Sequence, residues 1–302
     1  MNSGNNIHNS IAMSENGPVV AVIVHTGNQH TVKLFEFLDN DDTKYFYRGS
    51  IAEPDGYDAH EVAVSGDGNV VAYTDTKGFP QVKKLIKINV NDENDVHVFE
   101  SMGSLDEDVL GTTSFGFNGN VALSYDGKTI AIRDPSSVSK VLSYQGSEKG
   151  WKLEHTTPKG EEDKGIIIYH NMVSIASDGK PVAIGDEYDD DARGRIRMYS
   201  FDENSGWTKR MGDIMGISAE DRLYLPALSK DGTYLVGVAP GAIYVNVDKK
   251  EGSNYVLKQI CKPTESNLFG ISVGISTVGI SKDGSTVVFG DSDAYESRGA
   301  VY

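Results

Sequence analysis

The chain has 302 residues, of which 38% are hydrophobic and 24% charged, a composition typical of a soluble globular protein with a sizeable core. Its formal net charge of −16 repels phosphate backbones and argues against nucleic acid as a partner, whereas it suits cations, basic proteins or simply solubility. Cys261 is the only cysteine, which excludes an intrachain disulfide and a cysteine zinc site.

In chain order, the first feature is a hairpin signal at residues 14–17, Ser-Glu-Asn-Gly, between two apolar runs. The signal returns five times, as Ser-x-Asp-Gly at 65–68, 124–127, 229–232 and 281–284 and as Ala-Ser-Asp-Gly at 176–179. Asp-Gly between apolar runs predicts a tight hairpin turn, because glycine tolerates the positive φ that such turns need. The turn glycines are 51 to 59 residues apart, which predicts six repeats: Gly17, Gly68, Gly127, Gly179, Gly232 and Gly284.

Each repeat continues after the hairpin with a polar loop and a third strand of alternating pattern, clearest at Thr31–Phe37, Gly194–Tyr199 and Ala242–Val247. A fourth strand follows an acidic or Gly/Ser turn, and we expect it at Tyr45–Ile51, Val96–Leu105, Trp151–Leu153, Trp207–Ile214 and Tyr255–Ile260. The longest connections join the fourth strand to the next hairpin, and no stretch shows the pattern of an amphipathic helix.

Four antiparallel strands in a repeat of roughly fifty residues are typical of propeller blades, which bury their faces only by stacking on one another. We therefore expect an all-β fold, a six-bladed β-propeller with four antiparallel strands per blade, in which the first strand is innermost. It is expected to be a single domain over 1–302, with units at about 8–54, 58–107, 113–155, 168–216, 222–262 and 269–302. The last unit holds little more than its hairpin, so we expect an incomplete blade with an exposed edge.

The run Leu123-Ser124-Tyr125-Asp126-Gly127 before Ile130-Ala131-Ile132 resembles the hairpin of WD40 propellers. The wider unit is similar to FG-GAP-like propellers, including those of unicellular marine algae, in pieces such as Phe115-Gly116, Ala183-Ile184-Gly185 and Gly212-Asp213-Ile214. The resemblance implies a propeller fold and specifies function poorly. The FG-GAP calcium loop is shortened here to x-Asp-Gly, so the hairpins themselves are not expected to bind calcium.

The aspartates of the turns are open to two interpretations, as ligands or as groups that bond backbone N–H groups of the turn. Their repetition at one hairpin position favours the structural interpretation. A second candidate site consists of polar residues that immediately precede the first strands of the repeats. They would surround the mouth of the central channel of a propeller. There they could bind a ligand or a metal, or they could hydrogen-bond to the ends of the strands. They are His8, His60, Asn118, His170, Asn171 and Tyr224.

The third candidate is an acidic loop after a second strand, with five carboxylates in the six residues from 186 to 191. Such a loop is either solvated or a binding site for a divalent cation such as Ca²⁺. The candidate ligands, including those of the corresponding loop in the last unit, are Asp186, Glu187, Asp189, Asp190, Asp191, Asp291 and Asp293.

These features favour a non-enzymatic propeller that serves as a binding or scaffold module, with a basic protein as its partner. The alternatives are a cation-dependent (Ca-type) propeller hydrolase or lactonase and a carbohydrate-binding propeller. The chain shows no signal peptide, no N-glycosylation sequon and no apolar run that could span a bilayer, so we expect an intracellular, cytoplasmic location. The loops opposite the Asp-Gly turns differ in every repeat and are the expected binding surface.

Overall fold

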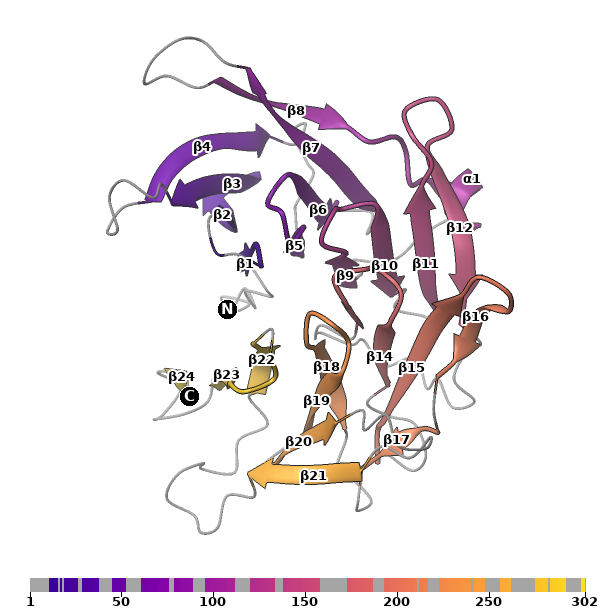
Figure 1. The fold of residues 1–302 in the computed structure, drawn as a ribbon. Coiled ribbons are helices and arrows are strands. Elements are labelled where there is room, and N and C mark those ends of the chain that lie inside the picture. Colours follow the sequence, from indigo (N-terminus) through magenta and orange to yellow (C-terminus); the bar gives the residue numbers. More distant parts are fainter. Residues whose placement is uncertain are drawn as a thin grey trace, which may run out of the picture. The chain divides into compact units, whose positions relative to one another are not determined.

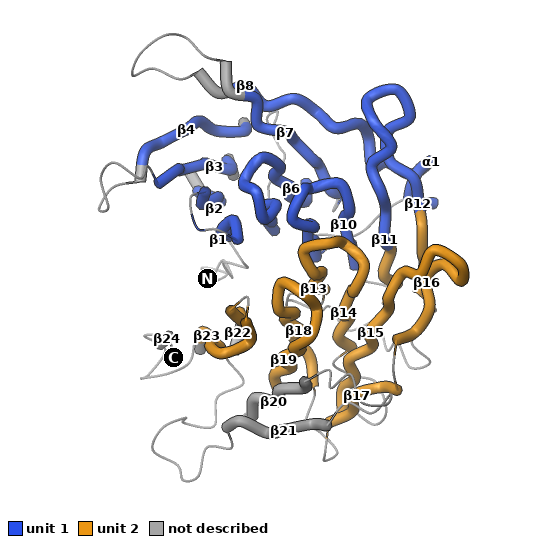
Figure 2. The backbone as a smooth tube through the Cα atoms, in the orientation of Figure 1, with its two compact units in different colours: residues 1–135, 141–153 blue, residues 136–140, 154–302 orange. Residues whose placement is uncertain are grey.

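A computed structural model of the chain describes residues 11–15, 17, 19–26, 29–37, 45–52, 61–75, 79–88, 96–111, 120–133, 138–157, 173–186, 193–210, 212–216, 223–239, 242–247, 256–261, 275–281, 283–291 and 300–301. The chain divides into two compact units, Met1–Pro135 with Val141–Leu153 and Ser136–Lys140 with Glu154–Tyr302 (Figure 2). The described residues form six antiparallel sheets, in which strands that follow one another in the chain lie side by side, except that β17 pairs with β15 and not with β16 (Figure 1).

The first two sheets lie in unit 1, and the third belongs to it except for the start of β11 and the end of β12. Sheet 1 contains β1 (Ile11–Met13), β2 (Val19–Thr26), β3 (Gln29–Phe37) and β4 (Tyr45–Ala52). Sheet 2 contains β5 (Val62–Val64), β6 (Val70–Thr74), β7 (Pro80–Ile88) and β8 (Val96–Ser101). Sheet 3 contains β9 (Asn120–Leu123), β10 (Thr129–Arg133), β11 (Ser139–Tyr144) and β12 (Trp151–Thr156).

The other three sheets lie in unit 2. Sheet 4 contains β13 (Val173–Ile175), β14 (Val182–Asp186), β15 (Arg195–Asp202), β16 (Gly206–Lys209) and β17 (Ile214–Met215). Sheet 5 contains β18 (Tyr224–Leu228), β19 (Tyr234–Ala239), β20 (Ala242–Val247) and β21 (Val256–Cys261). Sheet 6, as far as it is described, contains β22 (Ile275–Ile280), β23 (Val287–Asp291) and β24 (Ala300–Val301).

The predicted order of four antiparallel strands is confirmed in sheets 1 to 5, and two details of the prediction are wrong. The strand expected at Trp207–Ile214 is two short strands, because the chain leaves β15 after Lys209 and β17 pairs with β15 further along. The connection after β8 contains one helical turn, α1 (Glu107–Leu110), although no helix was expected. Asp106 caps its N-terminus, Gly111 ends it with a φ of 64°, and Leu110 is buried.

The core of each unit lies between successive sheets. Alternate residues of a strand point to opposite faces, so sheet 2 contributes one face to a cluster with sheet 1 and the other to a cluster with sheet 3, and sheet 5 does the same with sheets 4 and 6. Between sheets 1 and 2, for example, Ala21 and Leu34 pack with Val71 and Tyr73. Similar clusters lie between sheets 2 and 3, 4 and 5, and 5 and 6.

The Ser-x-Asp-Gly turns share one hydrogen-bond network. The serine N–H donates to the carbonyl of the residue five places further on, and the N–H of that residue donates back to the serine Oγ. The aspartate carboxylate accepts the N–H of the residue two places further on, and the glycine N–H donates to the serine carbonyl. Ser124, Asp126 and Gly127 show this pattern. The serine Oγ donates to the aspartate Oδ1 at 2.6–2.9 Å in the turns of sheets 2, 3, 5 and 6. The structural interpretation of these aspartates is therefore confirmed.

Neighbouring turns are also bonded to each other. The N–H of Glu15 donates to the carbonyl of Gly66 at 3.2 Å, and that of Asp67 donates to the carbonyl of Tyr125 at 2.9 Å. In unit 2 the N–H of Ser177 donates to the carbonyl of Lys230 at 2.9 Å. Within each unit, the turns thus set the spacing of the first strands of neighbouring sheets at this end.

We expect Gly127→Ala to destabilise the protein by about 2–5 kcal/mol, from a left-handed φ that costs alanine about 1–2 kcal/mol and from overpacking of about 1–3 kcal/mol. The φ of Gly127 is 65°, and a Cβ there would lie 2.5 Å from Cβ of Val70. Gly206→Ala is the matched control, because Gly206 has a φ of 72° and no atom within 4 Å of its Cβ position. Urea unfolding of both variants measures the difference; equal losses would show that the close approach does not matter.

The charge state of Asp283 depends on the serines of its own turn. Hydrogen bonds from the side chains of Ser281 and Ser285 lower the pKa of Asp283 from 3.8 to about 2. Because the folded pKa is lowered, this contribution to stability is present above pH 3.8 and is lost as the pH falls toward 2. Carboxyl NMR titration of the Ser281→Ala variant should show that the pKa of Asp283 rises toward 3.8. Asp202 is the control, because hydrogen bonds from Asn204 and Ser205 lower its pKa, and that pKa should not change in the variant.

Candidate functional site: buried charge pairs at the loop ends of the strands

Buried polar side chains fall into two groups. One consists of the serines of the turns, and the other lies at the opposite end of the strands, within three residues of a strand end. Because buried charges are costly unless paired, such clusters indicate sites with a specific role. The second group consists of Glu61, Thr74, Asp75 and Asn120 with Arg133 in unit 1, and of Ser139, Lys140, Thr157, Asp186 and Arg197 in unit 2.

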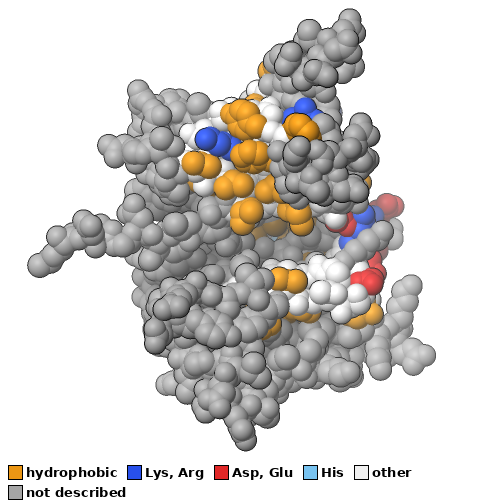
Figure 3. Space-filling model, turned by 90° about the vertical axis from the view of Figure 1, so that its left-hand side faces the viewer, with side chains coloured by type: hydrophobic (Ala, Val, Ile, Leu, Met, Phe, Trp, Pro, Cys, Tyr) orange, Lys and Arg blue, Asp and Glu red, His pale blue; other side chains and the backbone are white. Residues whose placement is uncertain are grey.

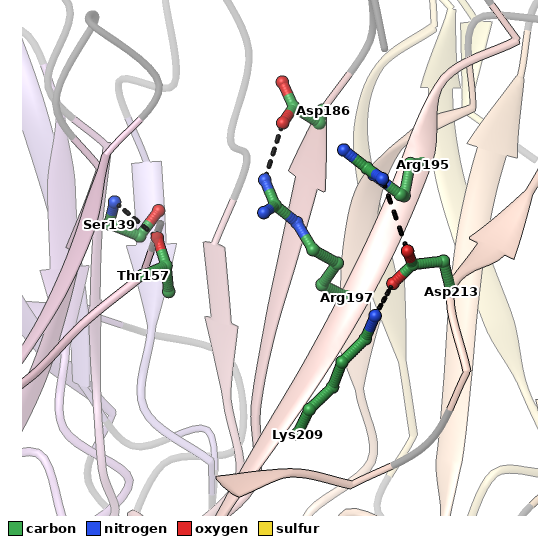
Figure 4. Close-up of polar contacts among 7 residues, drawn as sticks. All are labelled: Ser139, Thr157, Asp186, Arg195, Arg197, Lys209 and Asp213. Carbon is green, nitrogen blue, oxygen red and sulfur yellow. Dashed lines mark hydrogen bonds and ion pairs between the residues drawn. The ribbon is translucent and has the colours of Figure 1, made fainter. Parts of the chain in front are cut away.

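An ion pair between Asp186 and Arg197 is the centre of the group in unit 2 (Figure 4). Asp186 is the last residue of β14, and Arg197 lies in the neighbouring strand β15. Arg197 Nη2 donates to Asp186 Oδ2 at 2.7 Å, and the two side chains are only 6% and 8% exposed. The pair therefore ties the end of one strand to its neighbour at the point where the acidic loop begins.

An equivalent contact is present in unit 1. Asp75 and Asp186 occupy the same position in their repeats, seven residues after the turn glycine. Their partners, Gln81 and Arg197, also occupy matching positions, because each is paired in its sheet with the residue five places after that glycine. Gln81 Nε2 donates to Asp75 Oδ2 at 3.2 Å, and the N–H of Phe79 donates to Asp75 Oδ1 at 2.9 Å. A carboxylate at this place thus closes the base of the loop between the second and third strands in both units.

Two further polar contacts support the group in unit 2 (Figure 4). Asp213 lies between two cations, with Arg195 Nη1 3.3 Å from its Oδ2 and Lys209 Nζ 2.5 Å from its Oδ1. Ser139 and Thr157 exchange two bonds, in which each backbone N–H donates to the other residue, at 3.0 and 2.9 Å. These contacts tie β17 to β15 and β16, and the end of β12 to β11.

Aromatic side chains of β12, β15 and β16 lie close to one another in unit 2. The ring of His155 is 5.0 Å from that of Tyr199 and 6.0 Å from that of Trp207, nearly parallel to the latter. Burial lowers the pKa of His155, so the imidazole is biased toward its neutral form. Trp207 also contacts Phe201, and Trp151 is buried in the core between sheets 2 and 3, so both tryptophans have packing roles.

The predicted site residues are only partly described. Asp186 is the buried partner of Arg197, and Asp291 is the last residue of β23. His8, His60, Asn118, His170, Asn171, Glu187, Asp189, Asp190, Asp191 and Asp293 lie outside the described residues. Among the described residues, no three His, Cys, Asp or Glu side chains come together to hold a metal ion, and no helix there is long and apolar enough to cross a membrane.

Tyr224, which was expected immediately before the first strand of its repeat, is the first residue of β18 and is 2% exposed. A bulge between Tyr224 and Ala227 adds one residue to β18, and Leu225 within it has a φ of 46°. Because of the extra residue, Tyr224 pairs with Val238. It therefore occupies the position in sheet 5 that Asn120, which pairs with Arg133, occupies in sheet 3. Its side chain therefore belongs to the core between sheets 5 and 6.

Arg195, Arg197 and Asp213 were not among the predicted site residues. One signal in the sequence could have identified the arginines, because Arg193, Arg195 and Arg197 alternate directly after the acidic segment. Alternate residues of a strand share one face, which places basic side chains beside the base of an acidic loop.

No protein-family model and no curated protein matches the chain. Among solved structures, the chain is similar to the β-propeller domain of Cps50 (Swd1) from Myceliophteria thermophila, with a TM-score of 0.57, 10% identity, and 97% of this chain and 82% of that one covered. A protein from Lactobacillus plantarum gives a TM-score of 0.57, 14% identity and the same two coverages. A chain of a Mitotic Checkpoint Complex gives a TM-score of 0.53 and 14% identity over 95% of this chain and 85% of that one.

These similarities confirm the propeller fold and, at such low identity, show the fold alone. They give no support to a closer likeness to propellers of unicellular marine algae.

We expect Arg197→Met to destabilise the protein by about 3–5 kcal/mol, because it leaves the carboxylate of Asp186 buried without its cation. Arg197→Gln should cost less, since glutamine is the residue that bonds the equivalent carboxylate in sheet 2. Urea unfolding of the two variants measures the difference. Equal losses, or a Met variant as stable as the parent, would show that the charge pair does not hold this strand end.

Proposed function

We propose that the protein is a non-enzymatic propeller that binds another protein, one with a basic surface, through the loops opposite its Asp-Gly turns. The observation that carries the proposal is the different use of carboxylates at the two ends of the strands. At the turn end, Asp67, Asp126, Asp231 and Asp283 each accept hydrogen bonds from their own turn. At the loop end, buried pairs hold the strand ends from which the loops start.

The loop between β14 and β15 is the strongest candidate for the contact. Asp186 is neutralised by Arg197, so the pair contributes little net charge at its base. The sequence after it adds Glu187, Asp189, Asp190 and Asp191. Charged loops on a rigid scaffold are suited to recognition, and a negative surface steers a basic partner toward it.

The proposal takes residues 1–302 as one domain with six blades and an incomplete last blade. Six sheets with the same strand order support it, and sheet 6 has three strands within the described residues. Among the similar solved structures, one is a chain of a Mitotic Checkpoint Complex, so the same fold serves in at least one assembly. That likeness supports a scaffold role and does not identify a partner.

The test compares two variants with the same change in charge. Asp189, Asp190 and Asp191 are replaced together by lysine in one variant, and the exposed residues Glu100, Glu148 and Glu203 in the other. Each immobilised protein is incubated with lysate of the native organism, and bound proteins are identified by mass spectrometry. We expect basic proteins captured by the parent to be lost from the loop variant at least tenfold, because about 1.4 kcal/mol corresponds to tenfold.

The control variant should retain those proteins, and capture by the parent should weaken as salt is raised. If both variants lose the same proteins equally, only net charge matters. If neither loses any, the loop is not the binding surface.

A further inference from the structure

Five of the hairpin turns join an aspartate directly to a glycine: Asp67-Gly68, Asp126-Gly127, Asp178-Gly179, Asp231-Gly232 and Asp283-Gly284. In such a pair the backbone nitrogen of the glycine can attack Cγ of the aspartate, because glycine has no side chain to obstruct the approach. The attack forms a succinimide ring, and hydrolysis of the ring gives either aspartate or isoaspartate. The rate at each pair in the folded protein therefore depends on how firmly the turn holds the carboxyl group.

In the turns of sheets 2, 3, 5 and 6 a serine holds the carboxylate. The serine Oγ donates to Oδ1 of the aspartate at 2.6–2.9 Å. The N–H two residues after the aspartate donates to the same oxygen at 2.9–3.0 Å. Rotation of the aspartate side chain toward the glycine nitrogen breaks the serine bond, which is strong because its acceptor is charged.

The turn of sheet 4 has no such serine. Ala176 stands at its position, and among the described residues the carboxylate of Asp178 accepts only one hydrogen bond, from the N–H of Lys180 at 3.0 Å. The side chain of Asp178 is exposed, so water reaches the group that reacts. In all five turns the glycine N–H donates to the carbonyl three residues before it, at 2.9–3.1 Å. The turns therefore differ at the carboxylate and not at the attacking nitrogen.

A second change in the same turn accounts for the missing serine. In the other turns the serine Oγ also accepts the N–H of the residue five places further on. In sheet 4 that residue is Pro181, which has no N–H to donate. Ala176 and Pro181 pack instead on the next turn, since a Cβ on Gly232 would lie 3.4 Å from Cβ of Ala176 and 2.7 Å from Cγ of Pro181. The turn thus leaves no N–H unpaired at this place, and only the carboxylate loses a partner.

The charge of the carboxylate acts in the same direction. Ring closure uses the neutral carboxyl group, because its hydroxyl leaves as water. Hydrogen bonds from the side chains of Ser281 and Ser285 lower the pKa of Asp283 from 3.8 to about 2 and so reduce the amount of its neutral form. A serine in the turn therefore protects the aspartate by keeping it ionised as well as by holding it in place.

We propose that Asp178 is a site of isoaspartate formation, selected among the five Asp-Gly turns because its turn lacks the serine. The nitrogen of Gly179 forms a bond to Cγ of Asp178, and its proton leaves with the carboxyl hydroxyl as water. Water then opens the ring. Cleavage between the nitrogen and the backbone carbonyl carbon of Asp178 gives isoaspartate, and cleavage between the nitrogen and Cγ restores aspartate. This inference does not rest on the proposed binding function.

Isoaspartate would change the turn in two ways. It adds a carbon to the backbone between residues 178 and 179, next to the bond from the N–H of Ser177 to the carbonyl of Lys230 at 2.9 Å, and so loosens the contact between sheets 4 and 5. It also places an α-carboxylate on the exposed turn. Carboxyl methyltransferases that recognise isoaspartate transfer a methyl group from a sulfonium donor to an oxygen of this carboxylate, so the modified turn is a substrate for that class of enzyme.

The test follows all five pairs in one sample. The folded protein is incubated at mildly acidic pH and digested, and the isoaspartate form of each peptide is separated by chromatography and assigned by electron-transfer fragmentation. We expect conversion at Asp178 to be about tenfold faster than at the other four aspartates, since one hydrogen bond to a charged group corresponds to about that factor in rate. Labelling by a purified isoaspartyl methyltransferase provides a second readout.

The samples are kept dilute because sheet 1 has an open hydrophobic face. Ile11 is 65% exposed and Met13 60%, and Figure 3 shows hydrophobic side chains gathered on the side of the molecule where β3 and β4 lie in Figure 1. Such a surface promotes association of copies during a long incubation.

Ala176→Ser supplies the missing donor and should slow conversion at Asp178 about tenfold. A serine fits at this place, because Cβ of Ser14 lies 3.6 Å from the Cβ position of Gly68 in the corresponding contact of sheets 1 and 2.

Ser229→Ala makes the reverse change in sheet 5, where Ser229 Oγ donates to Asp231 at 2.8 Å. Conversion at Asp231 should rise about tenfold, while the rate at Asp126 in unit 1 stays unchanged in both variants. A rise at every pair would show general loosening of this variant, and the decision then rests on Ala176→Ser.

Incubation in urea separates the effect of the turn from that of the neighbouring residues, because the five pairs should convert at similar rates once the serine bonds are lost. Equal rates in the folded protein, a preference for Asp178 that persists in urea, or an Ala176→Ser variant that converts as fast as the parent would each overturn the proposal. Asn16, Asp55 and Asn118 also precede a glycine and lie outside the described residues. Fragmentation assigns their products separately, so they do not affect the comparison.

Discussion

The arrangement of the sheets depends on the hydrogen bond between the serine and aspartate side chains of the hairpin turns in sheets 2, 3, 5 and 6. This bond holds the aspartate carboxylate where it also accepts the N–H of the residue two places further on. It also holds the serine oxygen where it accepts the N–H at the start of the second strand. The turn then presents its glycine, which has no side chain, to the preceding sheet. One four-residue motif therefore closes the hairpin and sets the distance to its neighbour.

The fold could be predicted from the sequence because it is repeated, whereas much of the site could not. Turns such as Ser124 to Gly127 carry their own signal, since local chemistry is enough to form them. The bulge at Leu225 adds a residue without any glycine to mark it, and so shifts Tyr224 by one place. Arg197 depends on a contact between neighbouring strands, which composition and spacing do not specify.

The charge of the chain is distributed with a clear division of roles. Buried carboxylates such as Asp75 and Asp186 bond to side chains of the next strand, and Asp213, which is 23% exposed, binds two cations. Among the described residues only three acidic side chains are buried, Glu61, Asp75 and Asp186, so the others meet water, which screens their charge. A propeller of this kind can be strongly acidic without uncompensated charge between its sheets.

The helical turn α1 explains why the second repeat is the longest. Gly68 and Gly127 are 59 residues apart, whereas the other intervals are 51 to 53 residues. The added length lies after β8, where α1 places Leu110 in the core between sheets 2 and 3 beside Met102 and Leu105. Repeat length in this protein is thus not a measure of blade size. The connection that follows the fourth strand is the place where the chain accepts insertions, because neither the turn motif nor the strand register passes through it.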